Sequence, residues 1–308
     1  MQKRRGFVLA VLVLAVALVA AACSKSTTTD TGASPGASMG GNDLLAQVMA
    51  SGQLVVGTDP KYPPQSLLVN GQWEGFDIDV ANEIATRMGL TTKFTTPSWN
   101  QVVSGNWQGR MDVSVGSVTI TADRAKVLTF TSPYYYTPAG VAVYDTNTSI
   151  KSPADLAGKV VGVCGGCSYE EYLKGTLNIP DYPVDFQITG AQIKTYGTDS
   201  VAIQDLAKGD CLVLCAVFSA VPTLQNAADK GQPIKLLGDP LYFEPLAVAV
   251  DKESQVDSTS LGAKITEIVD AMHADGTLSQ LSCKWYKTDL TVPDPASAMD
   301  CSTISPAA

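Results

Sequence analysis

Short apolar runs alternate with amphipathic stretches along this chain, and the alternation occurs twice. Strand-like runs fall at residues 53–58, 92–96 and 111–118, and again at 159–164, 192–197 and 211–219. The stretches between them have helical periodicity, as in 75–89, where Ile78, Ala81 and Ile84 share one face. A strand–helix–strand–helix–strand order predicts a parallel sheet with right-handed crossovers. We therefore expect an α/β protein with two similar lobes.

Two further strand-like runs bracket the second series. One run, 139–145, precedes it, and the other, 245–253, follows it. A lobe that is entered by one strand and left by another is a hinge arrangement, because two crossing segments allow the lobes to close. The first lobe is expected to comprise residues 43–140 and 250–308, and the second lobe residues 141–249.

The N-terminal residues indicate export. Three basic residues among the first five precede an apolar stretch, Phe7–Ala22, which is typical of a secretory signal and short for a membrane span. We expect residues 1–22 to be removed and Cys23 to carry a lipid that holds the protein at the cell envelope, on the periplasmic or outer face of the cytoplasmic membrane. Residues 23–42, rich in Ser, Thr and Gly, predict a flexible tether. Ordinary signal cleavage after Ala22 stays open as the alternative.

Charge and histidine content exclude several classes of function. The net charge is −9 at pH 7, and no cluster of Lys and Arg follows the signal segment. Nucleic-acid binding needs a concentrated basic surface, so no nucleic-acid partner is expected. The single histidine, His273, stands near the predicted end of a helix, where it favours the helix dipole. A zinc enzyme or a Ser-His-Asp hydrolase is therefore not expected, and no metal or cofactor is predicted.

Five motifs follow one another along the chain: GTDPKYPP, GFDIDVANEIA, SVTITADRAKVLTFTSPYYY, VVGVCGGCSYEEYL and ADGTLSQLSCKWY. In order and spacing, residues 54–286 resemble the extracellular solute-binding proteins of the polar amino-acid uptake type. The resemblance implies a periplasmic-binding-protein clamshell, in which two lobes of mostly parallel sheet flanked by helices are joined by two hinge strands. It also implies a monomer that binds a small polar solute and passes it to the permease of an ABC importer.

Arg124 is the candidate anchor for a negatively charged part of the solute. It follows the third strand, and α/β sheets place ligands beyond the carboxyl ends of their strands. A guanidinium there can hold a carboxylate through two hydrogen bonds. By resemblance, Arg124 corresponds to the carboxylate anchor of the family, with Thr119 and Ser117 beside it, so a carboxylate-bearing solute is expected. The alternative is that Arg124 pairs with Asp123 or lies in solvent.

Three residues follow the first two strands and should lie at the same rim. Tyr62 and Trp99 present aromatic faces that could enclose the solute, with ordinary loop packing as the alternative. Asp59 matches, by resemblance, a position that contacts the cationic side chain of the ligand in relatives with basic ligands. Its alternative is a turn formed with Pro60.

The second lobe departs from the family pattern. By resemblance, the strand that contains Cys215 should end in an aspartate that accepts hydrogen bonds from the ammonium group of the solute, and Cys215 stands in its place. Cys167, followed by Ser168, replaces the usual Thr or Ser of the preceding loop. These three residues remain candidates for the ligand site. Asp199 is a substitute acceptor or, in the simpler interpretation, the N-cap of a helix.

Six cysteines besides Cys23 are an even number in an exported chain, which predicts disulfide bonds. Cys283 and Cys301 flank a tail that contains proline, and a bond between them would hold this tail to the last helix. They are the favoured pair.

The other four cysteines leave the pairing open. If the strand between Cys211 and Cys215 is extended, these residues lie about 13 Å apart at roughly 3.3 Å per residue. A disulfide needs Cα atoms within about 7 Å, so they should not pair. Cys215 is then expected near Cys164 or Cys167, and Cys211 has no obvious partner. The CGGC segment could instead be a redox pair, or the four cysteines a soft-metal site, and both rank below a structural disulfide.

The sequence thus predicts the substrate-binding component of an ABC importer, without enzymatic turnover, that captures a small carboxylate-bearing polar solute. One alternative is an enzyme on the same scaffold, such as a periplasmic dehydratase of the cyclohexadienyl type. Its candidate acid–base groups are Glu170, Glu171 and Glu244. Another alternative is a ligand-sensing receptor module.

Overall fold

The computed structural model describes residues 42–293 and 297–303. The predicted signal segment, Cys23 and the predicted tether up to residue 41 lie outside the described residues. Within the described ranges, no helix combines the length and the apolar character that crossing a membrane requires.

The first α/β unit contains three parallel strands and the helices that connect them. Its strands are β1 (Gln53–Gly57), β5 (Thr91–Thr95) and β6 (Val113–Thr119), and its helices are α2 (Phe76–Arg87) and α3 (Trp99–Val103). β1 pairs in parallel with β5 on one side and β6 on the other. Asp77 and Asp79 stand in the first turn of α2, where negative charge favours the helix dipole. The apolar face of α2, with Val80 and Ile84, packs into the core of this unit.

The second α/β unit repeats this arrangement. Its strands are β8 (Val160–Cys164), β9 (Gln192–Tyr196) and β10 (Ala216–Ala220), and its helices are α4 (Ser168–Leu173), α5 (Asp199–Leu206) and α6 (Val221–Asp229). β8 pairs in parallel with both β9 and β10. The strands alternate with helices as the sequence predicts, and Val161, Val163 and Phe218 are fully buried in the core.

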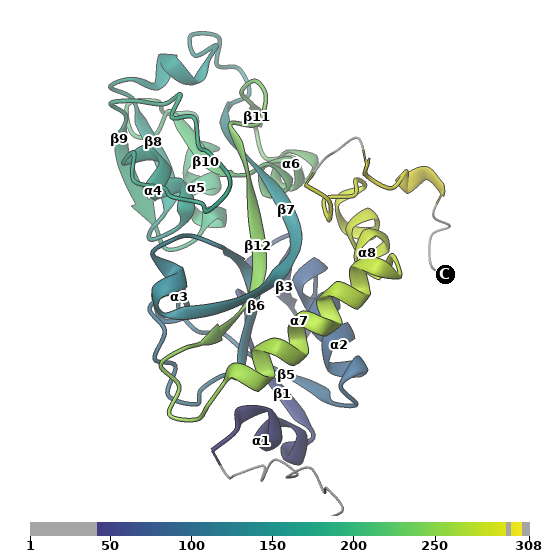
Figure 1. Ribbon diagram of the computed structural model, residues 1–308. Helices are drawn as coiled ribbons and strands as arrows, with labels where there is room; N and C mark the ends of the chain where they lie inside the picture. Colours follow the sequence, from purple (N-terminus) through teal and green to yellow (C-terminus); the bar gives the residue numbers. More distant parts are fainter. Residues whose placement is uncertain (1–41, 294–296, 304–308) are drawn as a thin grey trace, which may run out of the picture. The chain divides into compact units, whose positions relative to one another are not determined.

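Two long antiparallel strands, β7 (Leu128–Tyr144) and β12 (Tyr242–Asp251), join the units (Figure 1). The resulting sheet has the order β5-β1-β6-β12-β7-β10-β8-β9, with β11 (Ile234–Leu236) paired to β7. The predicted run at 139–145 is the C-terminal part of β7, which starts earlier because it pairs with β12 from Leu128 onward. The predicted α/β class with two crossing strands is confirmed.

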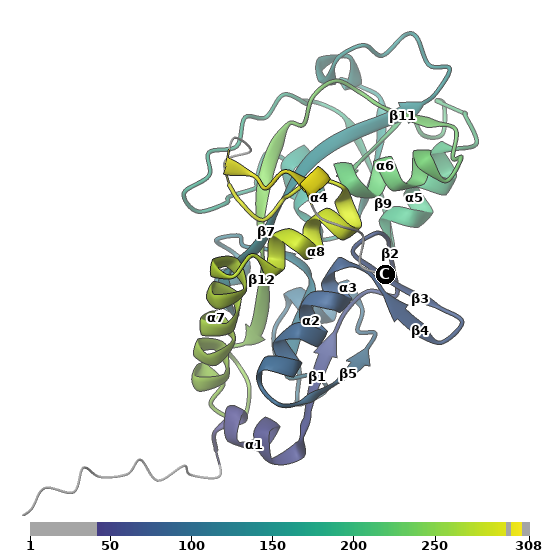
Figure 2. The ribbon, with the colours of Figure 1, turned by 90° about the vertical axis from the view of Figure 1, so that its right-hand side faces the viewer.

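The C-terminal helices α7 (Thr259–Ala274) and α8 (Thr277–Tyr286) pack against α2 of the first unit (Figure 2). Ile265, Val269 and Leu278 are buried in the same core as Ile84. The remaining elements are α1 (Leu44–Ser51), the small antiparallel sheet of β2 (Lys61–Tyr62), β3 (Ser66–Val69) and β4 (Gln72–Glu74), and 3-10 helices at Arg124–Lys126, Pro153–Leu156 and Cys301–Thr303.

The six described cysteines form three disulfide bonds. The pairs are Cys164–Cys167, Cys211–Cys215 and Cys283–Cys301, with Cα atoms 5.5, 4.0 and 5.2 Å apart. The last pair is the one favoured from the sequence. The expectation that Cys211 and Cys215 cannot pair is wrong, because the chain after Asp210 forms a turn and strand β10 begins only at Ala216.

The pairing of Cys164 also differs from the expectation. Cys164 bonds to Cys167 within its own loop, between β8 and α4, and not to Cys215. This pairing is local because the turn at Gly165 and Gly166 folds the chain back after the strand ends.

Candidate ligand-binding pocket

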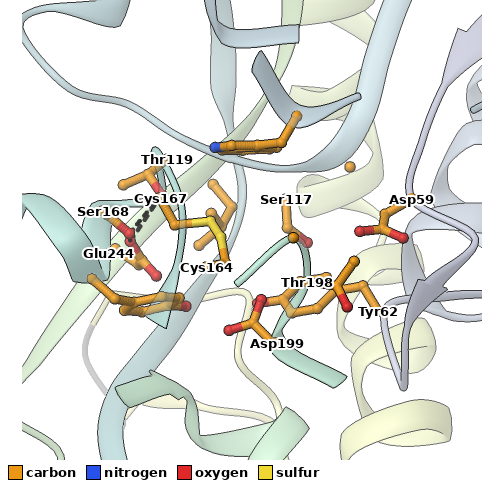
Figure 3. A pocket seen from close by; sticks show the side chains of 15 residues that line it. Asp59, Tyr62, Ser117, Thr119, Cys164, Cys167, Ser168, Thr198, Asp199 and Glu244 are labelled. Carbon is orange, nitrogen blue, oxygen red and sulfur yellow. Dashed lines mark hydrogen bonds between the residues drawn. A yellow bond between two sulfur atoms is a disulfide. The ribbon is translucent and has the colours of Figure 1, made fainter. Parts of the chain in front are cut away.

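A pocket lies where the carboxyl ends of strands from both units meet (Figure 3). Its empty space, which includes the open mouth, is about 530 Å³. The first wall, from the first unit, consists of Asp59, Tyr62, Trp99, Gly116, Ser117 and Thr119. The second wall, from the second unit, consists of Cys164, Cys167, Ser168, Tyr169, Gly197, Thr198 and Asp199. The crossing strand β12 adds Glu244 and Leu246.

The structure places five of the sequence-predicted residues in the first wall: Asp59, Tyr62, Trp99, Ser117 and Thr119. Trp99 is the first residue of α3, and its position is fixed by a capping box between Ser98 and Gln101. Asp59 forms the predicted turn, since its Oδ1 accepts a hydrogen bond from the Lys61 amide at 2.7 Å, and it also lines the pocket. Burial raises the pKa of Asp59.

The carbonyl oxygen of Gly166 links the two units. It accepts a hydrogen bond from Trp99 Nε1 at 2.9 Å and another from Arg124 Nη2 at 3.1 Å. Gly166 lies in the turn bridged by the Cys164–Cys167 disulfide, and its φ of 76° is in the left-handed region that favours glycine. The two walls are therefore held together across the pocket through one backbone carbonyl group.

Arg124 is buried beside the pocket and is not one of its lining residues. Its Nη1 donates to the carbonyl oxygen of Thr119 at 3.1 Å, and its guanidinium carbon lies 5.2 Å from the centre of the Trp99 ring. Its ion-pair partner is Glu171, at 3.7 Å from Nη2, so the alternative of a pair with Asp123 or a solvated side chain does not hold. Its Nε atom is buried and has no hydrogen-bond partner in the described part of the chain. Burial lowers the pKa of Arg124.

Glu244 reaches the pocket from β12, at the junction of the two walls. Its Oε2 accepts hydrogen bonds from Thr119 Oγ1 at 2.8 Å and from Ser168 Oγ at 2.6 Å (Figure 3). Burial raises the pKa of Glu244, and these hydroxyl groups oppose the increase. The predicted hydroxyls of Thr119 and Ser168 are thus engaged by a carboxylate. Glu170 and Glu171, the other candidate acid–base groups, do not line the pocket.

Asp199 lies in the second wall, and its interpretation as an N-cap is wrong. Thr198 caps α5, because its Oγ1 accepts from the Val201 amide at 3.3 Å. Asp199 Oδ1 is buried and accepts no hydrogen bond from the described residues. Burial raises the pKa of Asp199 to about 6, and the nearby Ser219 side chain opposes the increase. Its carboxylate lies within 4.8 Å of the sulfur atoms of Cys164 and Cys167. These sulfurs are bonded to each other and offer no thiolate to a metal ion.

Ser117 connects the first wall to a buried polar network. Its Oγ donates to Asp77 Oδ2 at 2.8 Å and lies 2.6 Å from Tyr135 Oη, while its amide donates to Tyr134 Oη at 3.0 Å. Tyr134 in turn donates to Asp77 Oδ1 at 2.8 Å. Burial raises the pKa of Asp77 to about 7 although these hydrogen bonds oppose the increase. The network holds Ser117 at a φ of 55°, which is uncommon outside glycine.

Cys215 lies outside the pocket, unlike Cys167 and Ser168. It precedes β10, and the residue that ends this strand is Ala220, which has no polar side chain. Sequence reasoning missed Tyr169 and Thr198. The signal for both was available, because each stands where a helix begins directly after a strand of the second unit.

Residues 54–288 match the family described as bacterial extracellular solute-binding proteins, family 3. The probable amino-acid-binding protein YxeM of Bacillus subtilis (strain 168) is 30% identical over 239 residues, which cover 78% of this chain and 86% of that protein. The L-cystine-binding protein TcyJ of Escherichia coli (strain K12) is 29% identical over 282 residues, 91% of this chain and 95% of that protein.

Solved structures show the same two-lobed architecture. An ancestral arginine-binding protein bound to arginine has a TM-score of 0.65 at 30% identity and covers 76% of this chain and 98% of its own. The ancestral amino acid-binding protein AncCDT-1, a precursor of cyclohexadienyl dehydratase, has a TM-score of 0.67 at 28% identity and covers 79% of this chain and 99% of its own. The predicted clamshell fold is therefore confirmed.

Proposed function

Because the chain belongs to the bacterial extracellular solute-binding proteins, family 3, we propose that it captures an amino acid or amino-acid derivative in the pocket between its two units. It is the substrate-binding component of an ABC importer and passes the solute to the permease. The observation that supports this most is the pocket, which both units line and across which Gly166 links the walls. A solute that contacts both walls stabilises the closed form relative to the open form.

The polar groups at the pocket suit a solute with charges of both signs. The buried Nε of Arg124 is an unused donor beside the first wall, and it is the group we assign to the carboxylate of the solute. Three acidic side chains, Asp59, Asp199 and Glu244, line the pocket and favour a positively charged group. Relatives named for cystine and arginine support an amino acid as the solute class.

A binding panel tests this proposal. The purified protein is titrated calorimetrically with the common amino acids, their N-acetyl forms and simple carboxylates, and thermal shifts are recorded in parallel. We expect one group of related solutes to bind with 1:1 stoichiometry. Tyr62→Ala should weaken this binding because Tyr62 lines the pocket, whereas Tyr182→Ala, outside the pocket, should not. Binding of no amino acid or derivative would contradict the proposal.

The position of Glu244 favours one alternative to a binding protein, an enzyme, which an experiment can test. Glu244 is buried in the pocket with a raised pKa, and AncCDT-1 is described as a precursor of a dehydratase. We propose that the protein turns over no solute, because both of its hydroxyl partners hold Glu244 in place from the two walls. Incubation of each bound solute with the protein, followed by mass spectrometry, should recover it unchanged. Conversion that Glu244→Gln abolishes would establish the enzyme instead.

We also propose that the mature chain is a monomer attached to the cell envelope through a lipid on Cys23, and that its lobes are residues 43–140 with 250–308 and residues 141–249. The export signal and the cysteine that follows it support the anchor. Cys23→Ala should release the protein from the membrane fraction. Retention of this variant on the membrane would contradict the lipid anchor.

A further inference from the structure

Among the residues that the structure describes, no positive group balances the buried negative charge of Asp199. Its side chain is 6% exposed, and Oδ1 has no hydrogen-bond partner. The ion pairs among the described residues do not include Asp199. Arg124, the buried cation beside the pocket, is paired with Glu171. An uncompensated carboxylate in such a position is costly, so its retention in a pocket wall indicates a partner that comes with the solute.

A second carboxylate faces Asp199 from the other wall. Asp59 follows β1 of the first unit and lines the same pocket; burial is the main cause of the raised pKa of Asp199, and the negative charge of Asp59 adds to it. The segments that carry these residues are in direct contact, since Ser200 Oγ donates to the carbonyl oxygen of Lys61 at 2.8 Å. Closure of the pocket therefore brings two like charges from opposite walls toward each other, which opposes closure while the pocket is empty.

The surroundings of the two carboxylates suit an organic cation. Tyr62 in the first wall and Tyr169 in the second wall line the same pocket, and aromatic rings attract ammonium and guanidinium groups. The nearby sulfur atoms of Cys164 and Cys167 are joined in a disulfide, so an organic cation is favoured over a metal ion at this place.

We propose that Asp199 binds a cationic group of the solute, an ammonium or a guanidinium, and that this group lies between Asp199 and Asp59 and draws the two walls together. The inference rests on the proposed function as a solute-binding protein. It deepens that function by assigning a positive charge as a required feature of the solute. Asp199 then takes the task that the resemblance assigned to the end of strand β10, where Ala220 offers no acceptor.

Matched solutes and an isosteric substitution test the assignment. Calorimetry compares L-arginine with L-citrulline, in which a neutral group replaces the guanidinium, and L-glutamine with N-acetyl-L-glutamine, which lacks the ammonium. In at least one pair the cationic member should bind the wild-type protein about tenfold more tightly or better. Asp199→Asn should remove this difference. Asp239→Asn, which changes an exposed carboxylate outside the pocket, should preserve it.

Thermal unfolding without solute distinguishes a binding role of Asp199 from a purely structural role. Asp199→Asn should raise the unfolding midpoint of the empty protein, because it removes a buried unpaired charge and its repulsion with Asp59, while it lowers solute affinity. A midpoint that falls with unchanged affinity would show a structural residue and overturn the inference.

Three other outcomes would also overturn it. Equal binding of both members of each pair would remove the cation requirement while leaving the proposed function in place. Stabilisation by Zn²⁺ or Cd²⁺ under reducing conditions, lost in Asp199→Asn, together with no preference for organic cations, would show a metal site instead. Failure of the wild-type protein to bind any member of either pair or of the wider panel would contradict the proposed function and the inference together.

Discussion

The two walls of the pocket differ in how their polar groups are satisfied. In the first wall, Ser117 is held by the buried network around Asp77, and the Nη groups of Arg124 donate to backbone carbonyls. In the second wall, Asp199 is buried with an unpaired oxygen, and a disulfide bridges the loop that contains Gly166. The first side thus leaves one donor for a solute, the Nε of Arg124, whereas the second wall leaves an acceptor, the carboxylate of Asp199. A solute that satisfies both groups couples binding to closure.

Among the substitutions that test this comparison, loss of Arg124 should have the largest effect on solute affinity. Arg124→Met leaves the carbonyl oxygens of Thr119 and Gly166 without these donors and removes the proposed carboxylate anchor. We expect about 100-fold weaker solute binding in calorimetry. Lys126→Met, which removes an exposed charge two residues away, is the control and should bind normally. Affinity of Arg124→Met within twofold of the wild type would place the anchor elsewhere.

Thr119→Val should have the next largest effect. The substitution keeps the shape of the side chain but removes the hydroxyl that donates to Glu244, leaving a buried carboxylate with one fewer donor. Solute affinity is expected to fall about tenfold. Thr119→Ser retains the hydroxyl and should stay close to the wild type. If both variants bind alike, the hydrogen bond to Glu244 has no part in closing the pocket.

The disulfides of the second unit should differ in their effect on binding. Replacing Cys164 and Cys167 by Ser frees the loop that presents the Gly166 carbonyl group to both donors of the first unit. We expect roughly threefold weaker binding, because only the order of a short loop is lost. The matched control replaces Cys211 and Cys215, which lie outside the pocket, and should leave affinity unchanged. Equal effects of the two double substitutions would contradict a specific role of the first disulfide.

The last prediction concerns the pH dependence of protein stability, to which the buried Asp77 beside the first wall contributes. Asp77 has a pKa of about 7 in the folded protein against 3.8 ordinarily, so between these values the folded state binds more protons than the unfolded state. Stability contributed by Asp77 is present at low pH and is lost as the pH rises toward 7. From pH 5 to 8 the unfolding midpoint of the wild type should fall roughly 5 °C more than that of Asp77→Asn. Parallel profiles would contradict the raised pKa.

Much of the fold could be predicted because apolar periodicity follows the burial of strands and helices. Both α/β units and the crossing strands were found in this way. The segment CLVLC is an exception, since an apolar run looks like a strand whether or not it is buried. Leu212 within it is 93% exposed, and the segment forms a turn that allows Cys211 and Cys215 to bond.

The first wall could be predicted more fully than the second. Tyr62, Trp99 and Thr119 lie next to recognisable strand and helix ends, so strand order alone brings them together. The residues of the second wall could not be predicted in this way, because their positions depend on where the helices start and on which polar groups stay without a hydrogen bond. The choice of Thr198 over Asp199 as the cap of α5 decides that Asp199 enters the pocket unpaired, and no sequence pattern distinguishes these neighbours.

Small-angle X-ray scattering tests the central claim, that the two walls close on a solute, most directly. The radius of gyration of the wild-type protein is measured without solute and at saturation with the tightest binder of the panel. We predict a smaller radius at saturation, because a solute that contacts both walls favours the closed form, in which Trp99 and Arg124 donate to the carbonyl oxygen of Gly166. An unchanged radius at proven saturation would contradict closure as the way in which this protein holds its solute.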